Sequence, residues 1–217
     1  MKKLSIGIDA NEANVKNRVG TGQYCYHILK HWHKEFEIDF HLYHRDPLHN
    51  DMPEESSHWH YHQVGPSRAW IRLGLPLYLL THPAHDVFWS PAHYAPWYSG
   101  GKSVVTIHDL AYEYFPNLFL PSDLYKLKHW TRAAIAKASR IISVSEATKH
   151  DLIKLYDVPA EKINVVHNGY DADIFNISPK ISPKLLSNYN LIPHSYILFL
   201  GTKIGRASCR ERVSSPV

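Results

Sequence analysis

The chain has few cysteines and no long apolar run. Its 217 residues include only Cys25 and Cys209, and only Cys25 lies outside an atypical final segment described below. A single thiol cannot form an internal disulfide, which agrees with a reducing compartment. The longest apolar stretches, such as 196–200, are far shorter than the roughly 20 residues that span a bilayer.

The amino terminus also lacks the features of a signal peptide. Met1-Lys2-Lys3 runs directly into a predicted strand at 4–9, without a long apolar region or a small-residue cleavage site. We therefore expect a cytoplasmic protein, with peripheral contact at the inner face of the membrane left open. The sequence has no internal repeat and no low-complexity tract, and its 44% hydrophobic and 12% aromatic content is ample for a packed core.

The last fifteen residues, 203–217, differ from the rest of the sequence. They hold four basic residues, one acid and no aromatic residue. The string from Ile204 to Val213 also resembles the translation of a DNA-sequencing adapter, so we expect 203–217 to be foreign to the natural protein. The alternative is a basic, disordered tail. Without this segment the formal net charge falls from +4 to about +1, so the basicity that might indicate a nucleic-acid partner largely disappears.

Short apolar runs alternate with longer helical patterns along the chain. This alternation predicts an α/β fold: a Rossmann-like, mainly parallel sheet with helices on both faces. The predicted strands are 4–9, 37–43, 86–89, 103–107, 140–144 and 163–166. The predicted helices are 22–34, 70–80, 122–138 and 145–156. The polar segment 47–63 is predicted to be a loop that leads into a short strand.

The pattern divides the chain into four parts. Residues 1–169 are predicted to form one domain, followed at 170–195 by a proline-containing connection with at most one short helix. The apolar run 196–202 predicts a further buried strand, and a lone strand cannot bury itself. We therefore interpret 196–202 as the first strand of a second domain, followed by the atypical segment 203–217.

The turn Gly20-Thr21-Gly22 is the first candidate binding element. Two glycines at the start of a helix let backbone N–H groups approach a ligand, and the helix amino terminus favours an anion such as a diphosphate. The dinucleotide-binding fingerprint fits poorly, because Cys25 occupies its third glycine position and about ten residues separate strand from glycines. An ordinary glycine-containing loop is the alternative.

Four further polar residues follow three of the predicted strands. His108 and Asp109 come at the carboxyl end of 103–107, where open α/β sheets bind ligands. The histidine could bond a ligand hydroxyl or stabilise developing charge, with the aspartate orienting it; a buried structural histidine is the alternative. Ser145 is interpreted as a helix cap first and a ligand contact second. Asn168 is interpreted as part of a turn or hinge.

Three other segments have two interpretations each. His58, His60 and His62 would share one strand face, and a polar face is favoured over a metal site because no cysteine or carboxylate has the matching spacing. The aromatic segment 89–98 fits a ligand platform or loop packing equally well. The segment 68–80 fits a buried helix better than a membrane-docking one.

Five motifs occur in a fixed order along the chain. They are Gly-x-Gly-x-Tyr at 20–24, Val-Thr-Ile-His-Asp-Leu-Ala at 105–111, Arg-Ile-Ile-Ser-Val-Ser-Glu at 140–146, Val-Pro-Ala-Glu-Lys-Ile-x-Val-Val-His-Asn-Gly at 158–169 and Phe-Leu-Gly-Thr at 199–202. Together they resemble family 4 glycosyltransferases over essentially the whole chain to Thr202. The sequence of 86–116 is similar to that of members that transfer mannose or related hexoses in bacterial polysaccharide assembly.

The resemblance implies the amino-terminal half of a GT-B fold, in which two Rossmann-like domains face each other. The second domain mainly holds a nucleotide-sugar donor and the first mainly holds the glycan or lipid-linked acceptor. Such enzymes retain anomeric configuration and generally need no metal or other cofactor.

Residue by residue, the resemblance implies that Gly20 and Gly22, with Thr21 between them, approach the donor diphosphate or the acceptor. His108 would contact the transferred sugar, with Asp109 beside it, and we add Ser145 and Asn168 as candidate binding residues. Family members place an arginine and a lysine soon after the strand that matches 196–200, but the match ends at Lys203. We therefore expect the 217-residue chain itself to be inactive. The alternatives are a dinucleotide-dependent Rossmann enzyme and a non-catalytic carbohydrate- or lipid-binding module.

Overall fold

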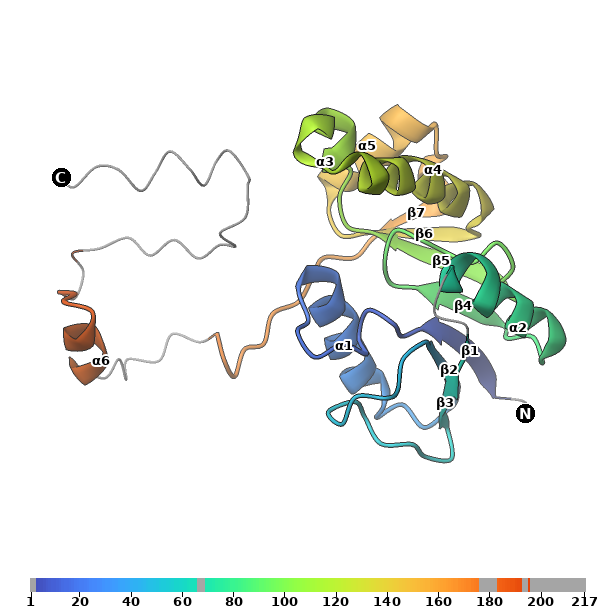
Figure 1. Cartoon of the computed structure of the whole chain (residues 1–217), viewed down its shortest axis with the longest axis horizontal. Helices are drawn as coiled ribbons and strands as arrows, with labels where there is room; N and C mark the ends of the chain where they lie inside the picture. Colours follow the sequence, from blue (N-terminus) through green and yellow to red (C-terminus); the bar gives the residue numbers. More distant parts are fainter. Residues whose placement is uncertain (1–2, 66–68, 176–182, 193–194, 196–217) are drawn as a thin grey trace. The chain divides into compact units, whose positions relative to one another are not determined.

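The computed structural model describes residues 3–65, 69–175, 183–192 and 195 (Figure 1). The chain divides into two compact units, Met1–Asn168 and Gly169–Val217. The described part of the second unit contains one short helix, α6 (Pro183–Asn188), inside the predicted connection 170–195. The predicted strand at 196–202 and the segment 203–217 lie outside the described residues.

The first unit is built on a seven-stranded sheet in the order β3-β2-β1-β4-β5-β6-β7. Every neighbouring pair is parallel. The strands are β1 (Leu4–Asp9), β2 (Ile38–His44), β3 (Trp59–Gln63), β4 (Val87–Ser90), β5 (Lys102–Ile107), β6 (Arg140–Ser143) and β7 (Ile163–Val165). The predicted parallel α/β fold is confirmed, and the ends of the six strands predicted with bounds differ from the observed ends by at most one residue. The strand order reverses between β1 and β4, which is where such sheets form a ligand-binding crevice.

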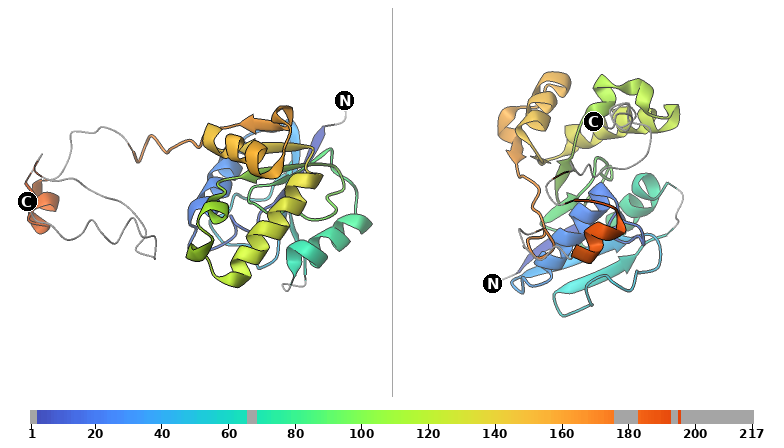
Figure 2. Two further views of the ribbon diagram at one scale, coloured as in Figure 1. Left: turned by 90° about the horizontal axis from the view of Figure 1, so that it is seen from above. Right: turned by 90° about the vertical axis from the view of Figure 1, so that its left-hand side faces the viewer.

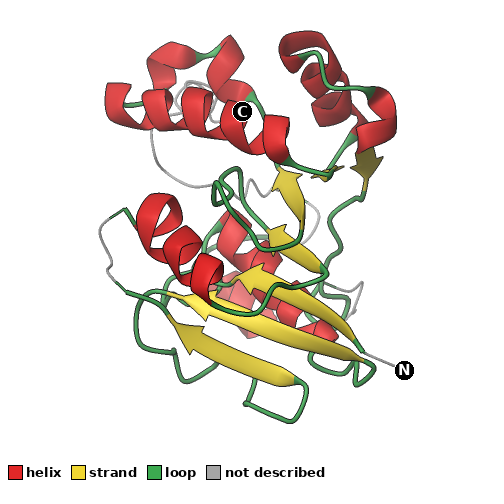
Figure 3. Ribbon diagram, turned by 90° about the vertical axis from the view of Figure 1, so that its right-hand side faces the viewer, coloured by secondary structure: helices red, strands yellow, loops and turns green. Residues whose placement is uncertain are grey.

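Helices cover both faces of this sheet (Figures 2 and 3). They are α1 (Gly20–Trp32), the π-helical segment η1 (Trp70–Gly74) that continues into α2 (Leu75–Thr81), α3 (Ala111–Tyr114), η2 (Pro116–Leu118), α4 (Pro121–Lys137), α5 (Glu146–Tyr156) and η3 (Ala160–Lys162). None of the helices in the described part of the chain is both long enough and apolar enough to cross a bilayer.

Alternation along β2 separates two of the three hydrophobic clusters. Phe40 and Leu42 point toward α1 and pack with Leu29 and Trp59. Tyr43 points to the opposite face, where it packs in the cluster that contains Leu79 and the other buried residues of α2. A third cluster joins β5 and β6 to α4 and α5. The core therefore takes up the side chains of the strand interiors, and the residues that follow the strands stay available for a site.

The histidines of the 58–62 segment do not all share one face. His60 and His62 point away from the α1 side, and the His62 Nε2 lies 2.9 Å from the His41 Nδ1. His58 precedes β3 and instead lies against Phe36, with its Nε2 on the His33 carbonyl. The predicted shared face therefore holds only for the two histidines inside the strand, because alternation applies only where the backbone is extended.

A cluster of partly buried histidines, of which His85 is the most buried, makes the fold sensitive to acid. Burial, reinforced by the neighbouring imidazoles, lowers the pKa of His41, His62 and His85 from 6.5 to about 4. His85 is held on both sides by hydroxyls, 2.6 Å from that of Tyr43 and 2.8 Å from that of Ser5. Between these two pH values the unfolded chain binds protons that the folded chain does not, so stability falls with falling pH.

We expect the midpoint of thermal unfolding to fall steadily as the pH is lowered from about 6.5 toward 4. Burial raises the pKa of Asp9 to about 7, so proton binding by Asp9 favours the folded chain as the pH falls. This effect comes from one group, whereas the three histidines act together against folding. Scanning calorimetry across this range measures the slope, and NMR titration of the histidine Hε1 resonances assigns it. A midpoint that is independent of pH, or histidine titrations near 6.5 at these three positions, would contradict the prediction.

Candidate functional site

The predicted site residues lie beyond the carboxyl ends of the strands, Asn168 among them because it follows β7. β1 ends at Asp9 and leads into the loop before α1, while β5 leads directly into His108 and Asp109. β6 leads into Ser145, which precedes α5. Because all strands are parallel, these ends share one edge of the sheet.

Gly22 is required by the way the loop before α1 folds over the helix start. A Cβ at this position would lie 2.6 Å from the backbone oxygen of Glu12 and 3.3 Å from the Arg18 Cβ. A Cβ on Gly20 would meet nothing within 4 Å. Only the second glycine of the turn is therefore needed for close approach of the backbone.

Arg18 holds the same loop in place. Its guanidinium makes two hydrogen bonds to the Asp51 carboxylate, at 2.5 and 2.7 Å, and its Nε donates to the Ala13 carbonyl. The guanidinium also lies over the Tyr26 ring, 3.9 Å from its centroid. These contacts hold the pKa of Asp51 well below its usual range, mainly through the hydrogen bond from Arg18. The loop that carries Glu12 is thus anchored to the helix that follows it.

His108 is held in one orientation at the centre of the site. Its Nε2 lies 2.8 Å from the Pro91 carbonyl oxygen, which can only accept, so Nε2 carries the proton and Nδ1 is left as an acceptor. Burial lowers the pKa of His108, and the Pro91 carbonyl, Asp109 and Glu12 oppose that effect. The ring of Tyr24, on α1, meets the imidazole edge to face with centroids 4.8 Å apart. Tyr24 thereby joins the glycine turn to His108.

Asp109 does not orient His108 as the sequence suggested. Its Oδ1 accepts the backbone N–H of Ala111, the first residue of α3, at 3.0 Å. The Pro91 carbonyl takes the orienting role instead. In a sequence, an aspartate that bonds the backbone two residues later looks the same as one that supports the neighbouring histidine, and here Asp109 acts on His108 only through its charge.

Ser145 is a helix cap, as its position predicts. Its Oγ accepts the Thr148 N–H at 3.1 Å and donates to the Thr148 hydroxyl, which in turn donates to the His108 carbonyl oxygen at 3.2 Å. The serine therefore reaches the site through Thr148. Asn168 is exposed at the end of the first unit, and no hydrogen bond or ring contact among the described residues joins it to His108.

Two residues that the sequence did not single out, Glu12 and His93, complete the site. The Glu12 carboxylate accepts a hydrogen bond from the Thr21 hydroxyl at 3.4 Å, and its charge acts on both His108 and Asp9. The His93 ring lies 5.9 Å from that of His108, and burial lowers its pKa to about 4. His93 lies in the aromatic segment 89–98 and Glu12 in the loop before the glycines, but only tertiary contact reveals their proximity to His108.

The arrangement suits a polar ligand that carries both hydroxyls and negative charge. The neutral imidazole of His108 offers an acceptor, Glu12 and Asp9 offer carboxyl oxygens, and the first turn of α1 offers the positive end of a helix dipole. Within the described residues, no group of three histidine, cysteine, aspartate or glutamate side chains is placed to hold a metal ion.

Comparison with known proteins identifies the family of the chain. The family model described as Glycosyltransferase Family 4 matches residues 19–174. The chain is 23% identical over 207 residues to the O-antigen chain mannosyltransferase B of Escherichia coli, covering 88% of this chain and 54% of that protein. It is 26% identical over 90 residues to the O-antigen chain mannosyltransferase RfbU of Salmonella typhimurium, covering 42% of this chain and 24% of that protein.

Solved structures show the same fold. The crystal structure of Anabaena Alr3699/HepE in complex with UDP matches with a TM-score of 0.55 and 16% identity, over 87% of this chain and 50% of that one. The chain thus spans about half the length of HepE and of mannosyltransferase B. The family model covers well over half of the present sequence, and the predicted resemblance is confirmed: the chain belongs to glycosyltransferase family 4.

Proposed function

We propose that residues 1–169 are the acceptor-side domain of a cytoplasmic glycosyltransferase that moves a hexose from a nucleotide sugar to a glycan or lipid-linked acceptor. Mannose is the favoured hexose, because both curated relatives are named as mannosyltransferases. Structures of HepE contain UDP and UDP-glucose, which supports a nucleotide-sugar donor. Retention of anomeric configuration and independence of metal belong to the same proposal and rest on the family resemblance.

The contact between Tyr24 and His108 carries this proposal. It brings the amino terminus of α1 beside His108, whose Nδ1 is left to accept a hydrogen bond. Amide groups in the first turn of α1 would bind phosphate oxygens, and His108 would accept a hydrogen bond from a sugar hydroxyl. These groups bind and orient the reactants, and the reaction exchanges the bond from sugar to diphosphate for one from sugar to acceptor.

A dinucleotide-dependent enzyme is the rival function. In that class a tight turn joins the first strand to the glycines, and the third glycine lets helix and strand pack closely. Here β1 ends at Asp9 and α1 begins at Gly20, and the third position is the fully buried Cys25. Both features disfavour the rival.

Ligand binding to the purified chain, followed by ¹H–¹⁵N NMR, separates the two functions. We expect UDP, GDP and their sugar conjugates to shift the amide signals of residues 20–24, and NADH to have no selective effect there. His108→Ala should weaken binding of the sugar conjugates by up to about tenfold, the value of one hydrogen bond. His150→Ala is the matched control, because that side chain is 73% exposed on α5. Preference for NADH, or equal effects of both variants, would contradict the proposal.

We expect the 217-residue chain to transfer no hexose by itself. The family resemblance assigns the donor nucleotide mainly to a second domain, and the chain spans about half the length of HepE and mannosyltransferase B. Losing even one group that stabilises a leaving group costs about a hundredfold in rate. Incubation with GDP-mannose and UDP-glucose, with chromatographic detection of released nucleotide, provides the measurement. Turnover above the protein-free rate would contradict the prediction.

A further inference from the structure

The backbone of His108 lies just beyond the paired part of β5 and β6. The pairing of these strands ends at Ile107 and Ser143, so His108 is the first residue after this ladder. Its carbonyl oxygen accepts a hydrogen bond from the Thr148 hydroxyl, at 3.2 Å, in the first turn of α5. A side chain of the following helix thus holds the backbone that carries the imidazole at the point where the sheet ladder stops.

The Thr148 hydroxyl is fixed in direction. A carbonyl oxygen can only accept, so Thr148 donates its proton to His108, and its oxygen accepts the proton of the Ser145 hydroxyl, 3.0 Å away. The Ser145 Oγ in turn accepts the Thr148 backbone N–H at 3.1 Å. Thr148 is buried, which keeps water from competing for these bonds. The start of α5 therefore forms one chain of hydrogen bonds that ends on the His108 backbone.

The same side of α5 also holds α3, the helix that begins three residues after His108. The buried residues of α5 recur every four residues and so form one side of the helix: Thr148, Leu152 and Tyr156. The Tyr156 hydroxyl donates to the Glu113 carboxylate at 2.6 Å and lies 2.8 Å from the Tyr112 hydroxyl. One face of α5 is thus bonded to the end of β5 through Thr148 and to α3 through Tyr156.

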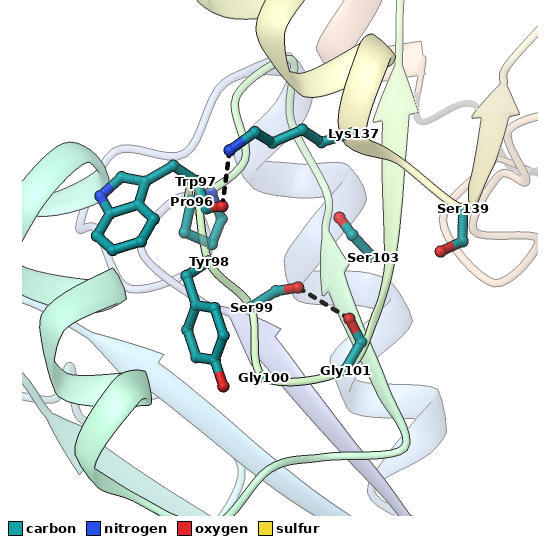
Figure 4. Close-up of a pocket in the computed structure, with 9 residues that line it drawn as sticks. All are labelled: Pro96, Trp97, Tyr98, Ser99, Gly100, Gly101, Ser103, Lys137 and Ser139. Atoms are coloured by element: carbon teal, nitrogen blue, oxygen red, sulfur yellow. Dashed lines mark hydrogen bonds between the residues drawn. The ribbon is translucent and has the colours of Figure 1, made fainter.

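The opposite end of β5 offers a contrast (Figure 4). Ser103, near the start of the strand, lines a cavity of about 420 Å³ together with Lys137 and Ser139. Its Oγ is buried and has no hydrogen-bond partner among the described residues. His108 lies five residues further on, about 16 Å along the strand. Ser103 is therefore a buried hydroxyl on the same strand that does not reach His108, which makes it a suitable control position.

We propose that Thr148 is a positioning residue for His108, an inference that rests on the proposed role of His108 in binding the sugar. The imidazole is held at its ring by the Pro91 carbonyl, 2.8 Å from Nε2, and at its backbone by Thr148. A binding group must be held within about 0.5 Å of its working position by such supporting contacts. The two bonds together set the position of Nδ1, the acceptor for a sugar hydroxyl. Thr148 touches no reactant in this role and acts through His108.

Two variants of the full 217-residue chain test this inference. Thr148→Val removes the donor and nearly keeps the shape of the side chain, whereas Thr148→Ser keeps the donor. In the valine variant the ¹⁵N signals of the His108 imidazole should move toward a mixture of the two neutral tautomers, because the bond from Nε2 to Pro91 weakens. The dissociation constants of GDP-mannose and UDP-glucose should rise about threefold, and those of GDP and UDP should stay unchanged. The serine variant should restore both the signals and the affinity.

A double-mutant cycle separates positioning from support of the fold. In a chain that carries His108→Ala, Thr148→Val should weaken binding of the sugar conjugates no further, because it acts through the missing imidazole. Ser103→Ala and Thr131→Val are the controls, because they remove buried hydroxyls at the start of β5 and on α4. Both should leave the His108 signals unchanged.

Ser145→Ala keeps the test decisive if circular dichroism shows that the valine variant does not fold. It removes the donor to the Thr148 oxygen and should move the His108 signals in the same direction by a smaller amount. Unchanged His108 signals in these variants, a Thr131→Val effect as large as that of Thr148→Val, or a further loss of affinity in the His108→Ala chain would overturn the positioning role. If the unsubstituted chain binds neither sugar conjugate, the proposed function fails, and the His108 signals alone then decide whether Thr148 positions the ring.

Discussion

Replacing Trp59 by alanine is expected to lower the free energy of unfolding by about 3–5 kcal/mol, the range for truncating a large buried aromatic side chain. Trp59 is fully buried in the cluster beneath α1. Its ring packs against Phe40 on the neighbouring strand, with centroids 5.0 Å apart, and meets the His33 ring edge to face at 5.2 Å. The cavity left by alanine would remove the side-chain contacts that join β3 to α1.

Trp59→Phe provides the matched control for this effect. The indole Nε1 is buried and has no hydrogen-bond partner among the described residues, so phenylalanine removes a desolvated donor as well as some volume. We expect a loss below about 1.5 kcal/mol, because the aromatic contacts largely remain. Urea unfolding followed by circular dichroism, with the slope compared between variants, measures both values. If alanine and phenylalanine cost the same, ring packing is not what holds this strand.

The sheet could be predicted because its central strands are buried on both faces and form short Val- and Ile-rich runs. The edges of elements were less predictable. Lys102 is the first residue of β5 and pairs with Val87 of β4, although its side chain is exposed. A search for apolar runs therefore starts this strand one residue too late. α1 begins at Gly20 with Val19 before it and no side-chain cap, so no capping residue marked its start.

The helix predicted at 70–80 shows a different limit. Its first turn is π-helical after Ala69, whose φ of 55° is unusual for a residue with a side chain. Pro76 then occupies the first turn of α2, where its missing N–H is tolerated. The sequence indicates helical periodicity here but does not indicate which ladder of hydrogen bonds forms.

The candidate site could be predicted in position better than in detail. The parallel topology alone brings the ends of β1, β5 and β6 to one edge, which is why His108 and the glycine turn were expected together. The group that orients His108 is the backbone carbonyl of Pro91. Every residue has a backbone carbonyl, so nothing in the sequence marks this one. Glu12 reaches the site through loop folding, which no local pattern encodes.

Gly22→Ala is expected to destabilise the chain by about 1–3 kcal/mol and to weaken ligand binding at the site at least tenfold. Alanine ordinarily stabilises a helix relative to glycine by up to about 1 kcal/mol. Here the added Cβ would lie 2.6 Å from the Glu12 backbone oxygen. The loop has little freedom to retreat, because Arg18 anchors it to Asp51.

The added Cβ must push Glu12 and α1 apart, and this displacement explains why ligand affinity should fall more than the free energy of unfolding. Moving Glu12 away from α1 shifts its carboxylate relative to Thr21, and moving α1 instead shifts Tyr24 relative to His108. Gly20→Ala is the control, because its Cβ meets nothing within 4 Å and should leave stability unchanged or higher. Thermal unfolding and NMR titration with UDP on the two variants provide the comparison. Should both alanines behave alike, close backbone approach at position 22 does not shape the site, and the helix start is an ordinary glycine-containing turn.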